Sequence, residues 1–356
     1  MFFVKKAILY EKLPASAVRC KACSWYCKIP EGTTGICGVR ENIKGDLYLL
    51  VYGKPIAVHI DPIEKKPLFH FLPGTEIFSI GTYGCSFSCD FCQNWDISQS
   101  PRELKIQYAA DKKALRENLY RMIDACEDWP PEKIVEYCIR NKIPSIAYTY
   151  NEPAIFFEYA YDTAKLAREA GLKNIFVSNG FESIEAIEKI SPYLDANNID
   201  LKGWTEDFYN KICHARLAPV KENIKRFRDA GVWVEVTTLL IPGHNDSDNE
   251  LKSIAEFLVN ISPEIPWHVT AFHPSYKMQN VPSTPAKTLE RAYKIGKAAG
   301  LKYVYTGNIW GLEGENTHCP KCSELLIKRS GASVVENYLK NDACPKCGFK
   351  IKGIWK

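Results

Sequence analysis

Short β-branched or aromatic runs alternate with amphipathic helical patterns from residue 76 to residue 306. The strand-like runs are 77–81, 145–150, 174–178, 197–201, 232–241, 267–272 and 302–306, and the helical stretches include 154–170, 183–190, 220–230, 247–259 and 285–299. This alternation predicts parallel strands joined by crossover helices. A βα repeat of about 30 residues suits either a doubly wound sheet or a full or partial (β/α) barrel, and periodicity does not choose between them.

The ends of the helical stretches carry their own signals. Gly171, Gly231 and Gly300 each follow an alanine at the end of a stretch, as a glycine after a helix C-terminus should. The segment 96–142 is longer than a usual crossover, so we expect an extra helix over 111–124 before Pro130 and Pro131 begin the next one.

Two flanking parts accompany this central region. Runs 46–52 and 55–60 flank Gly53 and Lys54 and predict a hairpin in a small β-rich module. Cysteine pairs in a polar, lysine-rich setting mark the C-terminal part. We therefore expect an N-terminal four-cysteine module over 1–70, a core over 71–312 and a C-terminal module over 313–356.

Charge and hydropathy exclude several classes of protein. The 46 Lys+Arg and 42 Asp+Glu residues give a net charge of +4, which argues against the concentrated basic field of a nucleic-acid-binding protein. No segment reaches about 18 uninterrupted apolar residues, and the first 14 residues lack the apolar stretch of a signal peptide. The sequence predicts a cytoplasmic protein with no membrane partner.

The 14 cysteines are grouped rather than scattered. In a reducing cytosol, grouped cysteines in a long chain indicate metal ligands rather than disulfides. The three groups are Cys20, Cys23, Cys27 and Cys37; Cys85, Cys89 and Cys92; and Cys319, Cys322, Cys344 and Cys347. Cys126, Cys138 and Cys213 remain, and we expect them to be ordinary small buried side chains.

The central group directly follows the first strand of the core, with Gly81 and Gly84 making the turn. Three thiolates in one loop do not complete a structural tetrahedral zinc site, but they can hold three irons of a [4Fe-4S] cluster. The fourth iron then keeps an open coordination position, where chemistry can occur. A loop at the carboxyl end of a barrel strand is also where such folds assemble active sites. The alternative is a zinc or electron-transfer site with a distant fourth cysteine.

The spacing CxxxCxxC, with Phe91 before the last cysteine, resembles the signature of the radical S-adenosylmethionine (SAM) superfamily. The resemblance implies that SAM binds the open iron through its amino and carboxylate groups. It also implies that one electron cleaves SAM to methionine and a 5′-deoxyadenosyl radical. Phe91 is then expected beside the cofactor, and a flavodoxin- or ferredoxin-type protein is expected as the low-potential electron donor.

The resemblance covers nearly the whole chain. Segments 37–42, 61–66, 71–74, 92–98, 147–153 and 198–202 are similar to the AmmeMemoRadiSam-system branch, which is related to the pyruvate formate-lyase activating enzymes. It implies an α/β fold with a partial (β/α)6-type TIM barrel as the radical SAM core, between the N-terminal cysteine-rich β module and a C-terminal zinc ribbon. The resemblance to this branch does not identify a substrate.

Further residues are expected near the cofactor. Glu152 stands after the second strand, where relatives place an acid that receives the SAM amino group, although the usual paired glycines are missing here. The alternative is an ordinary helix N-terminal acid. Asn179 follows the third strand and Asp200 and Lys202 end the fourth, at positions that line the SAM pocket or a cation site in relatives. A mutual ion pair is the alternative for Asp200 and Lys202.

The two outer groups differ in spacing. The C-terminal group consists of two Cys-Pro-Lys-Cys knuckles, which predict a closed four-thiolate zinc site that folds a small tail. The N-terminal group suits either zinc or an auxiliary Fe–S cluster, and its spacing does not decide.

The sequence thus predicts a radical SAM enzyme that abstracts hydrogen from a substrate it does not identify. The substrate is either a small molecule or a partner protein on which the enzyme generates a glycyl radical. The alternative from another class is a non-catalytic Fe–S and zinc module with a redox or binding role.

Overall fold

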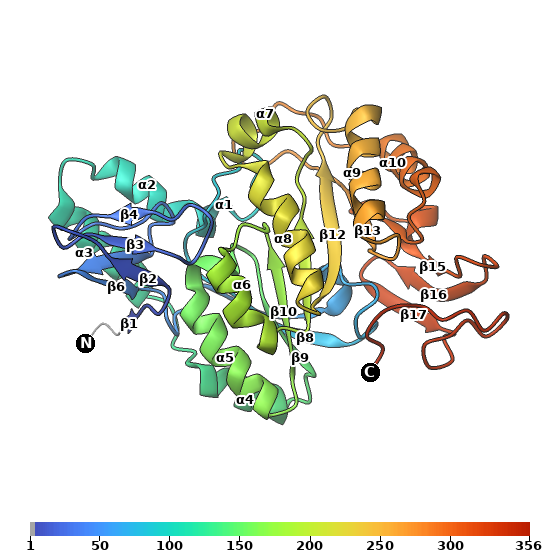
Figure 1. Cartoon of the computed structure of the whole chain (residues 1–356), viewed down its shortest axis with the longest axis horizontal. Coiled ribbons are helices and arrows are strands. Elements are labelled where there is room, and N and C mark those ends of the chain that lie inside the picture. Colours follow the sequence, from blue (N-terminus) through green and yellow to red (C-terminus); the bar gives the residue numbers. More distant parts are fainter. Residues whose placement is uncertain (1–3) are drawn as a thin grey trace. The chain divides into compact units, whose positions relative to one another are not determined.

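The computed structural model describes residues 4–356 and divides into two compact units. Unit 1 comprises Met1–Ile60 and Ile77–Asp195, and unit 2 comprises Asp61–Glu76 and Ala196–Lys356. Figure 1 shows the strands and the helices of the chain. The three modules expected from the sequence are defined by their cysteine groups, whereas the two units are defined by how compactly the residues pack. The three modules therefore remain a prediction.

Unit 1 begins with two small antiparallel sheets. One has the order β2-β3-β4 and the other the order β1-β6-β5. Their bounds are β1 (Lys5–Lys6), β2 (Tyr10–Lys12), β3 (Val18–Cys20), β4 (Lys28–Ile29), β5 (Arg40–Ile43) and β6 (Asp46–Leu49). These short strands form the expected β-rich setting of the first cysteine group.

The prediction of a hairpin across Gly53 and Lys54 is wrong. β6 pairs with β5 instead, in the register Ile43↔Asp46, and β7 (Ala57–Pro62) is not part of that sheet. The turn consists of Lys44 and Gly45, with φ values of 53° and 80°. Two consecutive positive φ values match the type I′ turn that suits the twist of paired strands.

The remaining strands of unit 1 are parallel. β8 (Glu76–Gly81) and β10 (Lys173–Ser178) both pair with β9 (Ser145–Tyr148), so the carboxyl ends of all three lie at one edge. The helices are α1 (Trp95–Ser98), α2 (Ser100–Gln107), α3 (Lys112–Asp124), α4 (Pro131–Arg140), η2 (Pro153–Phe156), α5 (Phe157–Glu169), α6 (Ile184–Ile190) and η3 (Ser191–Tyr193). The predicted extra helix is α3, whose first turn is capped by Asp111 through the N–H of Ala114.

Unit 2 repeats the βα pattern. Its parallel strands are β11 (Ala196–Asp200), β12 (Trp233–Leu240), β13 (Trp267–Ala271) and β14 (Val304–Gly307), paired in that order. The other elements are η1 (Ile63–Lys65), α7 (Glu206–Phe208), η4 (Tyr209–Cys213), α8 (Leu217–Asp229), α9 (Asp248–Ile261), α10 (Ala286–Ala299) and η5 (Glu313–Glu315). Gly231 and Gly300 adopt φ values of 83° and 109° after α8 and α10, as expected of C-terminal glycines. The predicted α/β class with parallel strands is confirmed.

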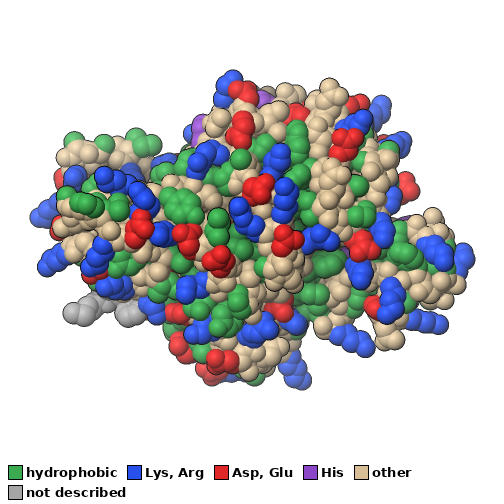
Figure 2. All heavy atoms as spheres, viewed as in Figure 1, with side chains coloured by type: hydrophobic (Ala, Val, Ile, Leu, Met, Phe, Trp, Pro, Cys, Tyr) green, Lys and Arg blue, Asp and Glu red, His purple; other side chains and the backbone are tan. Residues whose placement is uncertain are grey.

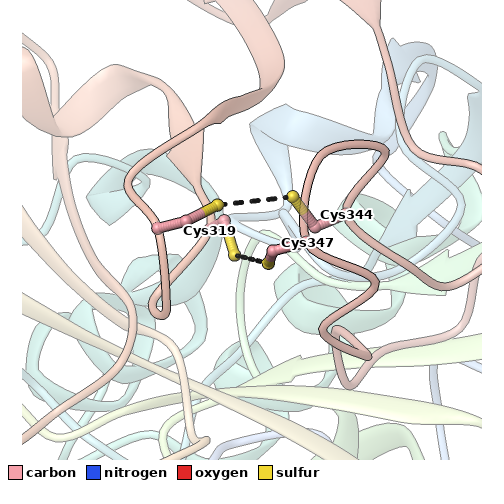
Figure 3. A group of neighbouring side chains, drawn as sticks. Cys319, Cys344 and Cys347 are labelled. Atoms are coloured by element: carbon pink, nitrogen blue, oxygen red, sulfur yellow. Dashed lines mark hydrogen bonds between the residues drawn. The ribbon is translucent and has the colours of Figure 1, made fainter.

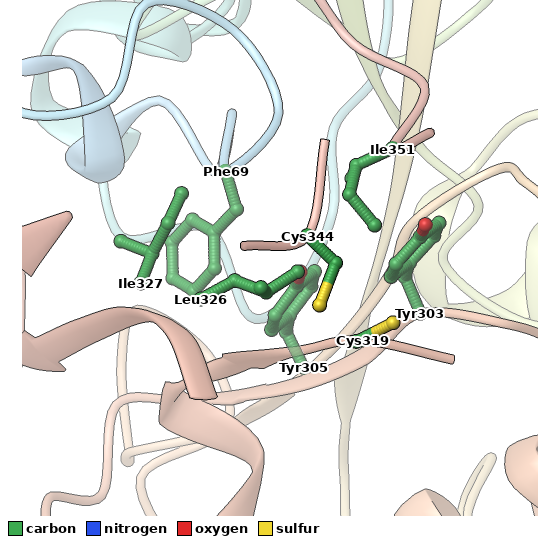
Figure 4. Packing of buried hydrophobic residues seen from close by; sticks show 8 residues of the cluster. All are labelled: Phe69, Tyr303, Tyr305, Cys319, Leu326, Ile327, Cys344 and Ile351. Atoms are coloured by element: carbon green, nitrogen blue, oxygen red, sulfur yellow. The ribbon is translucent and has the colours of Figure 1, made fainter. Parts of the chain in front are cut away.

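The C-terminal residues fold as a three-stranded antiparallel sheet, with β16 (Leu325–Ser330) between β15 (Thr317–His318) and β17 (Ser333–Asn337). Figure 4 shows buried side chains of this part packed against Phe69, Tyr303 and Tyr305. The cluster consists of Phe69, Tyr303, Tyr305, Cys319, Leu326, Ile327, Cys344 and Ile351. The tail therefore shares a core with the rest of unit 2.

Basic and acidic side chains are interspersed on the face drawn in Figure 2. Among the helices formed by residues 4–356, none is long and apolar enough to cross a bilayer.

Candidate active site and metal centres

The central cysteines lie in the loop that leaves the carboxyl end of β8. Cys89 is buried, whereas Cys85 and Cys92 are partly exposed. The backbone N–H of Phe87 approaches Cys85 Sγ to 3.4 Å, and Cys92 Sγ lies 3.3 Å from Ser98 Oγ. A hydrogen bond to a cysteine sulfur stabilises its thiolate, which is the form that binds metal.

Two glycines allow close approach of the backbone around this loop. A Cβ atom at Gly81 would lie 2.8 Å from the carbonyl oxygen of Thr149, and one at Gly84 would lie 2.6 Å from that of Cys37. Gly84 also has a φ of 93°, which side-chain-bearing residues rarely adopt. The predicted glycine turn is present, and it brings the loop against a residue of the N-terminal cysteine group.

Asn151, which the sequence analysis did not single out, ties the loop after β9 to the cysteine loop. Its Oδ1 accepts a hydrogen bond from the N–H of Thr82 at 3.2 Å, and its Nδ2 donates to the Gly84 carbonyl at 2.8 Å. Tyr150, with a φ of 68°, presents its carbonyl to Asn94 Nδ2 at 2.7 Å. The positions of these amides relative to the cysteines come from the tertiary fold, so no local sequence signal indicated them.

Glu152 is fully buried at the carboxyl end of β9. Its Oε1 accepts the N–H of Ala154 at 3.0 Å and caps η2, and its Oε2 accepts the N–H of Asn179 at 2.8 Å. The alternative role as a helix N-terminal acid is therefore present in the structure. The pKa of Cys85 is raised, mainly because the thiol is desolvated by the surrounding protein and further by the charge of Glu152. The carboxylate thus acts electrostatically on the first cysteine of the loop.

Asn179 lies at the carboxyl end of β10 and also reaches the cysteine loop. Its Nδ2 donates to Ser86 Oγ at 3.0 Å and lies 4.0 Å from Cys85 Sγ. Its Oδ1 accepts the N–H of Phe181 at 3.1 Å, which fixes the amide orientation. Three adjacent strands thus bring Cys85, Glu152 and Asn179 to one site.

The other expected cofactor residues are Phe91, Asp200 and Lys202. Phe91 is buried within the cysteine loop. Asp200 and Lys202 belong to unit 2 and form a mutual ion pair, with 2.7 Å between Lys202 Nζ and Asp200 Oδ2. This ion pair is the alternative that the sequence left open.

The N-terminal cysteine group lines a small cavity in unit 1. All four cysteines face it, together with Trp25, Arg40 and Ser86, the residue that follows Cys85. Trp25 Nε1 donates to the carbonyl of Ser86 at 2.8 Å. Arg40 is buried and paired with Glu158. The group is therefore attached to the central cysteine loop through its own lining residues.

The C-terminal group converges most closely. Cys319 Sγ lies 3.6 Å from Cys347 Sγ, and Cys322 Sγ lies 3.7 Å from Cys344 Sγ. All four sulfur atoms lie within 4.8 Å of one another. Figure 3 shows Cys319, Cys344 and Cys347 pointing toward a common centre. The four cysteines can therefore hold a metal ion. Cys126, Cys138 and Cys213 are buried, as predicted.

The chain matches one protein family and several known proteins. Residues 79–258 match the radical SAM superfamily. An uncharacterised protein from Methanocaldococcus jannaschii is 44% identical over 351 residues, which are 98% of this chain and 99% of that protein. A second protein from that organism, named as a candidate glycyl-radical enzyme activating enzyme, is 26% identical over 54% of this chain and 65% of its own.

Two solved structures are more distant in sequence. A domain of a pyruvate-formate lyase-activating enzyme from Bacteroides vulgatus is 20% identical, covers 46% of this chain and 98% of its own, and has a TM-score of 0.41. A radical SAM methyltransferase from Sphaerobacter thermophilus is 15% identical over 67% of this chain and 68% of its own, with a TM-score of 0.48.

This chain is a member of the radical SAM superfamily and therefore an enzyme of that class. The superfamily uses a [4Fe-4S] cluster and SAM, and the relatives of this chain include a candidate activating enzyme. The placement in the AmmeMemoRadiSam branch stays a prediction from sequence.

Proposed function

We propose that Cys85, Cys89 and Cys92 hold a [4Fe-4S] cluster at which SAM is reductively cleaved, so that the enzyme abstracts hydrogen from its substrate. The supporting observation is that the loop after β8 meets the residues that follow β9 and β10. Asn179 approaches Cys85 and binds the carboxylate of Glu152 through its backbone. When bound, the cluster supplies the electron that cleaves SAM to methionine and a 5′-deoxyadenosyl radical.

The donor set fits such a cluster. Three cysteines from one loop supply three thiolates, and a backbone N–H approaches the first of them. The loop follows the carboxyl end of a parallel strand, where α/β folds assemble their sites. The hydrogen bonds from Asn151 and Asn94 hold the neighbouring backbone in place.

Glu152 and Asn179 are proposed to bind SAM beside the cysteines, with Phe91 lining the loop. Glu152 already caps η2, but each oxygen of an ionised carboxylate can accept more than one hydrogen bond. A SAM ammonium is therefore a compatible additional donor. Asp200 and Lys202 of unit 2 are likewise proposed to be cofactor-binding residues.

The outer cysteine groups are proposed as two further metal sites. A tetrahedral zinc site with Zn–S bonds of about 2.3 Å has sulfur atoms about 3.8 Å apart. The separations of 3.6 Å and 3.7 Å in the C-terminal group match this geometry, so we assign it zinc. The N-terminal group is assigned a thiophilic metal centre, either zinc or an Fe–S cluster. Iron, sulfide and zinc analysis of the purified protein decides between them.

The substrate is proposed to be either a small molecule or a partner protein. The candidate activating enzyme from M. jannaschii supports a protein substrate, because activating enzymes generate a radical on another chain. A flavodoxin- or ferredoxin-type protein is the proposed reductant. A purely structural or redox-sensing role for the metals would leave SAM uncleaved.

The test is anaerobic reconstitution with iron and sulfide, followed by dithionite and SAM. We expect 5′-deoxyadenosine and methionine in equal amounts, since one cleavage produces both fragments. The non-catalytic alternative predicts that SAM is recovered intact although the cluster is reduced.

A further inference from the structure

Unit 2 contains a cavity of about 290 Å³ at the carboxyl ends of β13 and β14. Thr270 and Gly307, near the ends of these two strands, line it together with His268. Phe69 and Trp310 contribute aromatic walls. Its size and mixed lining are those of a small-molecule site.

His268 contacts the buried carboxylate of Glu235, which accepts four hydrogen bonds. Glu235 Oε1 accepts the N–H of His70 at 2.8 Å and the indole N–H of Trp233 at 3.0 Å. Its Oε2 accepts the N–H of Phe69 at 3.0 Å and lies 2.6 Å from Nε2 of His268. Backbone and indole N–H groups only donate, so these contacts favour the ionised, accepting form of Glu235. Burial raises the pKa of Glu235, but the hydrogen bond from His268 and the nearby histidines hold it below its usual value.

The ionised carboxylate fixes the tautomer of His268. An acceptor at 2.6 Å requires that Nε2 carry a hydrogen, which leaves Nδ1 as the ring nitrogen that can accept a hydrogen bond. The ring is held by Tyr305, with centroids 5.2 Å apart, and by the edge of Phe69 at 4.8 Å. His268 is 2% exposed, and Nδ1 has no hydrogen-bond partner within residues 4–356.

Several neighbouring polar groups are paired in one directed chain, whereas the hydroxyl of Thr306, which also lines the cavity, has no hydrogen-bond partner among the described residues. Arg329 Nη1 donates to Thr317 Oγ1, which lies 2.8 Å from the Tyr305 hydroxyl. That hydroxyl is 2.7 Å from His70 Nε2, and His70 Nδ1 is 2.7 Å from the carbonyl of Lys352. The carbonyl only accepts, so each hydroxyl donates in turn toward His70. Nδ1 of His268 is therefore an acceptor that this chain of hydrogen bonds leaves available to a ligand.

The walls of the cavity indicate the chemistry of that ligand. Phe69 and Trp310 offer flat apolar faces, and Trp310 packs so closely on Gly331 that a Cβ there would lie 1.2 Å from the indole ring. Among the lining residues, Glu64 is buried and its Oε2 has no hydrogen-bond partner. The only lining cation, Lys65, is mostly exposed and 3.4 Å from Asp61. The lining thus holds two carboxylates, those of Glu64 and Glu315, and one cation, which disfavours an anion.

We propose that this cavity binds a small neutral or cationic molecule with a flat ring and an N–H or O–H group that donates to Nδ1 of His268. His268 is then a ligand-binding residue, and Glu235 is a positioning residue that acts through it.

Binding of simple probes to the iron-reconstituted protein tests the proposal. Phenol, benzylamine and benzoate share one ring and differ in charge and donor. We expect phenol and benzylamine to bind at millimolar or lower concentration by ligand-observed NMR, and benzoate to bind at least tenfold more weakly. Equal or tighter binding of benzoate, or no binding of any probe, would overturn the proposal.

Two variants locate the binding. The side-chain amide of Gln can occupy the place of Nε2, so His268→Gln keeps the donor to Glu235 and removes the acceptor in the cavity. We expect phenol affinity to fall about threefold to tenfold, as for loss of one hydrogen bond. Trp310→Ala should weaken both neutral and cationic probes, whereas Lys252→Gln on the exposed face of α9 should leave them unchanged.

The tautomer gives a readout that does not depend on any variant folding. We expect the ¹⁵N shift of His268 Nδ1 in the wild-type protein to be that of an unprotonated ring nitrogen and to move when phenol is added. A protonated Nδ1, or wild-type affinity in His268→Gln, would contradict the assignment. These measurements need no SAM cleavage, so failure of the proposed function and failure of this pocket are distinguishable.

Discussion

The backbone N–H of Asn179 donates a 2.8 Å hydrogen bond to Glu152 Oε2, which joins the carboxyl ends of β10 and β9. Through its side chain, Asn179 also reaches Ser86 and lies 4.0 Å from Cys85 Sγ. A single asparagine therefore links the proposed SAM-binding carboxylate to the proposed cluster loop. A change at Glu152 should affect both SAM binding and local order.

Glu152→Gln should weaken SAM binding. The neutral amide loses the charge-assisted contact to the SAM ammonium, so we expect affinity to fall roughly tenfold to a hundredfold. The variant should also lose about 1–3 kcal/mol of stability, because the Gln NH₂ group cannot accept the N–H of Asn179. Titration of SAM into reconstituted protein, with iron content checked, measures the first effect. An affinity change below about threefold would rule out the SAM contact.

Gly84→Ala should separate the N-terminal cysteine group from the central loop. The added Cβ would lie 2.6 Å from the Cys37 carbonyl, so the backbone must shift. We expect a loss of stability of about 1–3 kcal/mol beyond the cost of the positive φ. Gly171→Ala is the matched control, because Gly171 also has a positive φ but nothing lies within 4 Å of its Cβ position. Urea unfolding that gives equal losses for both variants would contradict the close packing.

The C-terminal metal should stabilise the tail and the core that it shares with Phe69 and Tyr305. Replacing Cys322 and Cys347 with serine should remove about one zinc per chain. A loss of about 2 kcal/mol of stability, at about 2–4 °C for each kcal/mol, should lower Tm by roughly 4–8 °C. Elemental analysis and a thermal scan measure both effects. Unchanged zinc content in the double variant would contradict the assignment.

His70 should make unit 2 less stable in acid. Burial lowers the pKa of His70 to about 4, against an ordinary value of 6.5. The unfolded chain therefore binds the proton first, and stability is lost as the pH falls from 6.5 toward 4, by roughly 3 kcal/mol. His70→Asn keeps a donor for the Lys352 carbonyl and has no titrating ring. Urea midpoints between pH 7 and 4 should fall less steeply in this variant than in the wild type, and equal slopes would contradict this account.

The sequence predicted most of the helices and strands but not the tertiary contacts between them. Periodicity and glycine positions indicated the parallel strands and helices, and spacing identified the compact C-terminal cysteine group. The hairpin prediction failed because Lys44 with Gly45 is a weaker turn signal than the expected Asn-Gly or Asp-Gly pair. Contacts such as Gly84 with Cys37, or Glu235 with His268, join residues far apart in the chain. Only the tertiary fold brings these pairs together, so no local pattern could indicate them.

The central claim is that Cys85, Cys89 and Cys92 hold the cluster that cleaves SAM. The most direct measurement compares 5′-deoxyadenosine formation and iron content in two triple alanine variants, both reconstituted anaerobically and reduced with dithionite. One variant lacks Cys85, Cys89 and Cys92. The control lacks Cys126, Cys138 and Cys213, the three buried cysteines outside the groups.

The account predicts that the first variant loses about four irons per chain and all SAM cleavage, whereas the control keeps both. SAM cleavage at the wild-type rate in the variant without Cys85, Cys89 and Cys92 would contradict the account.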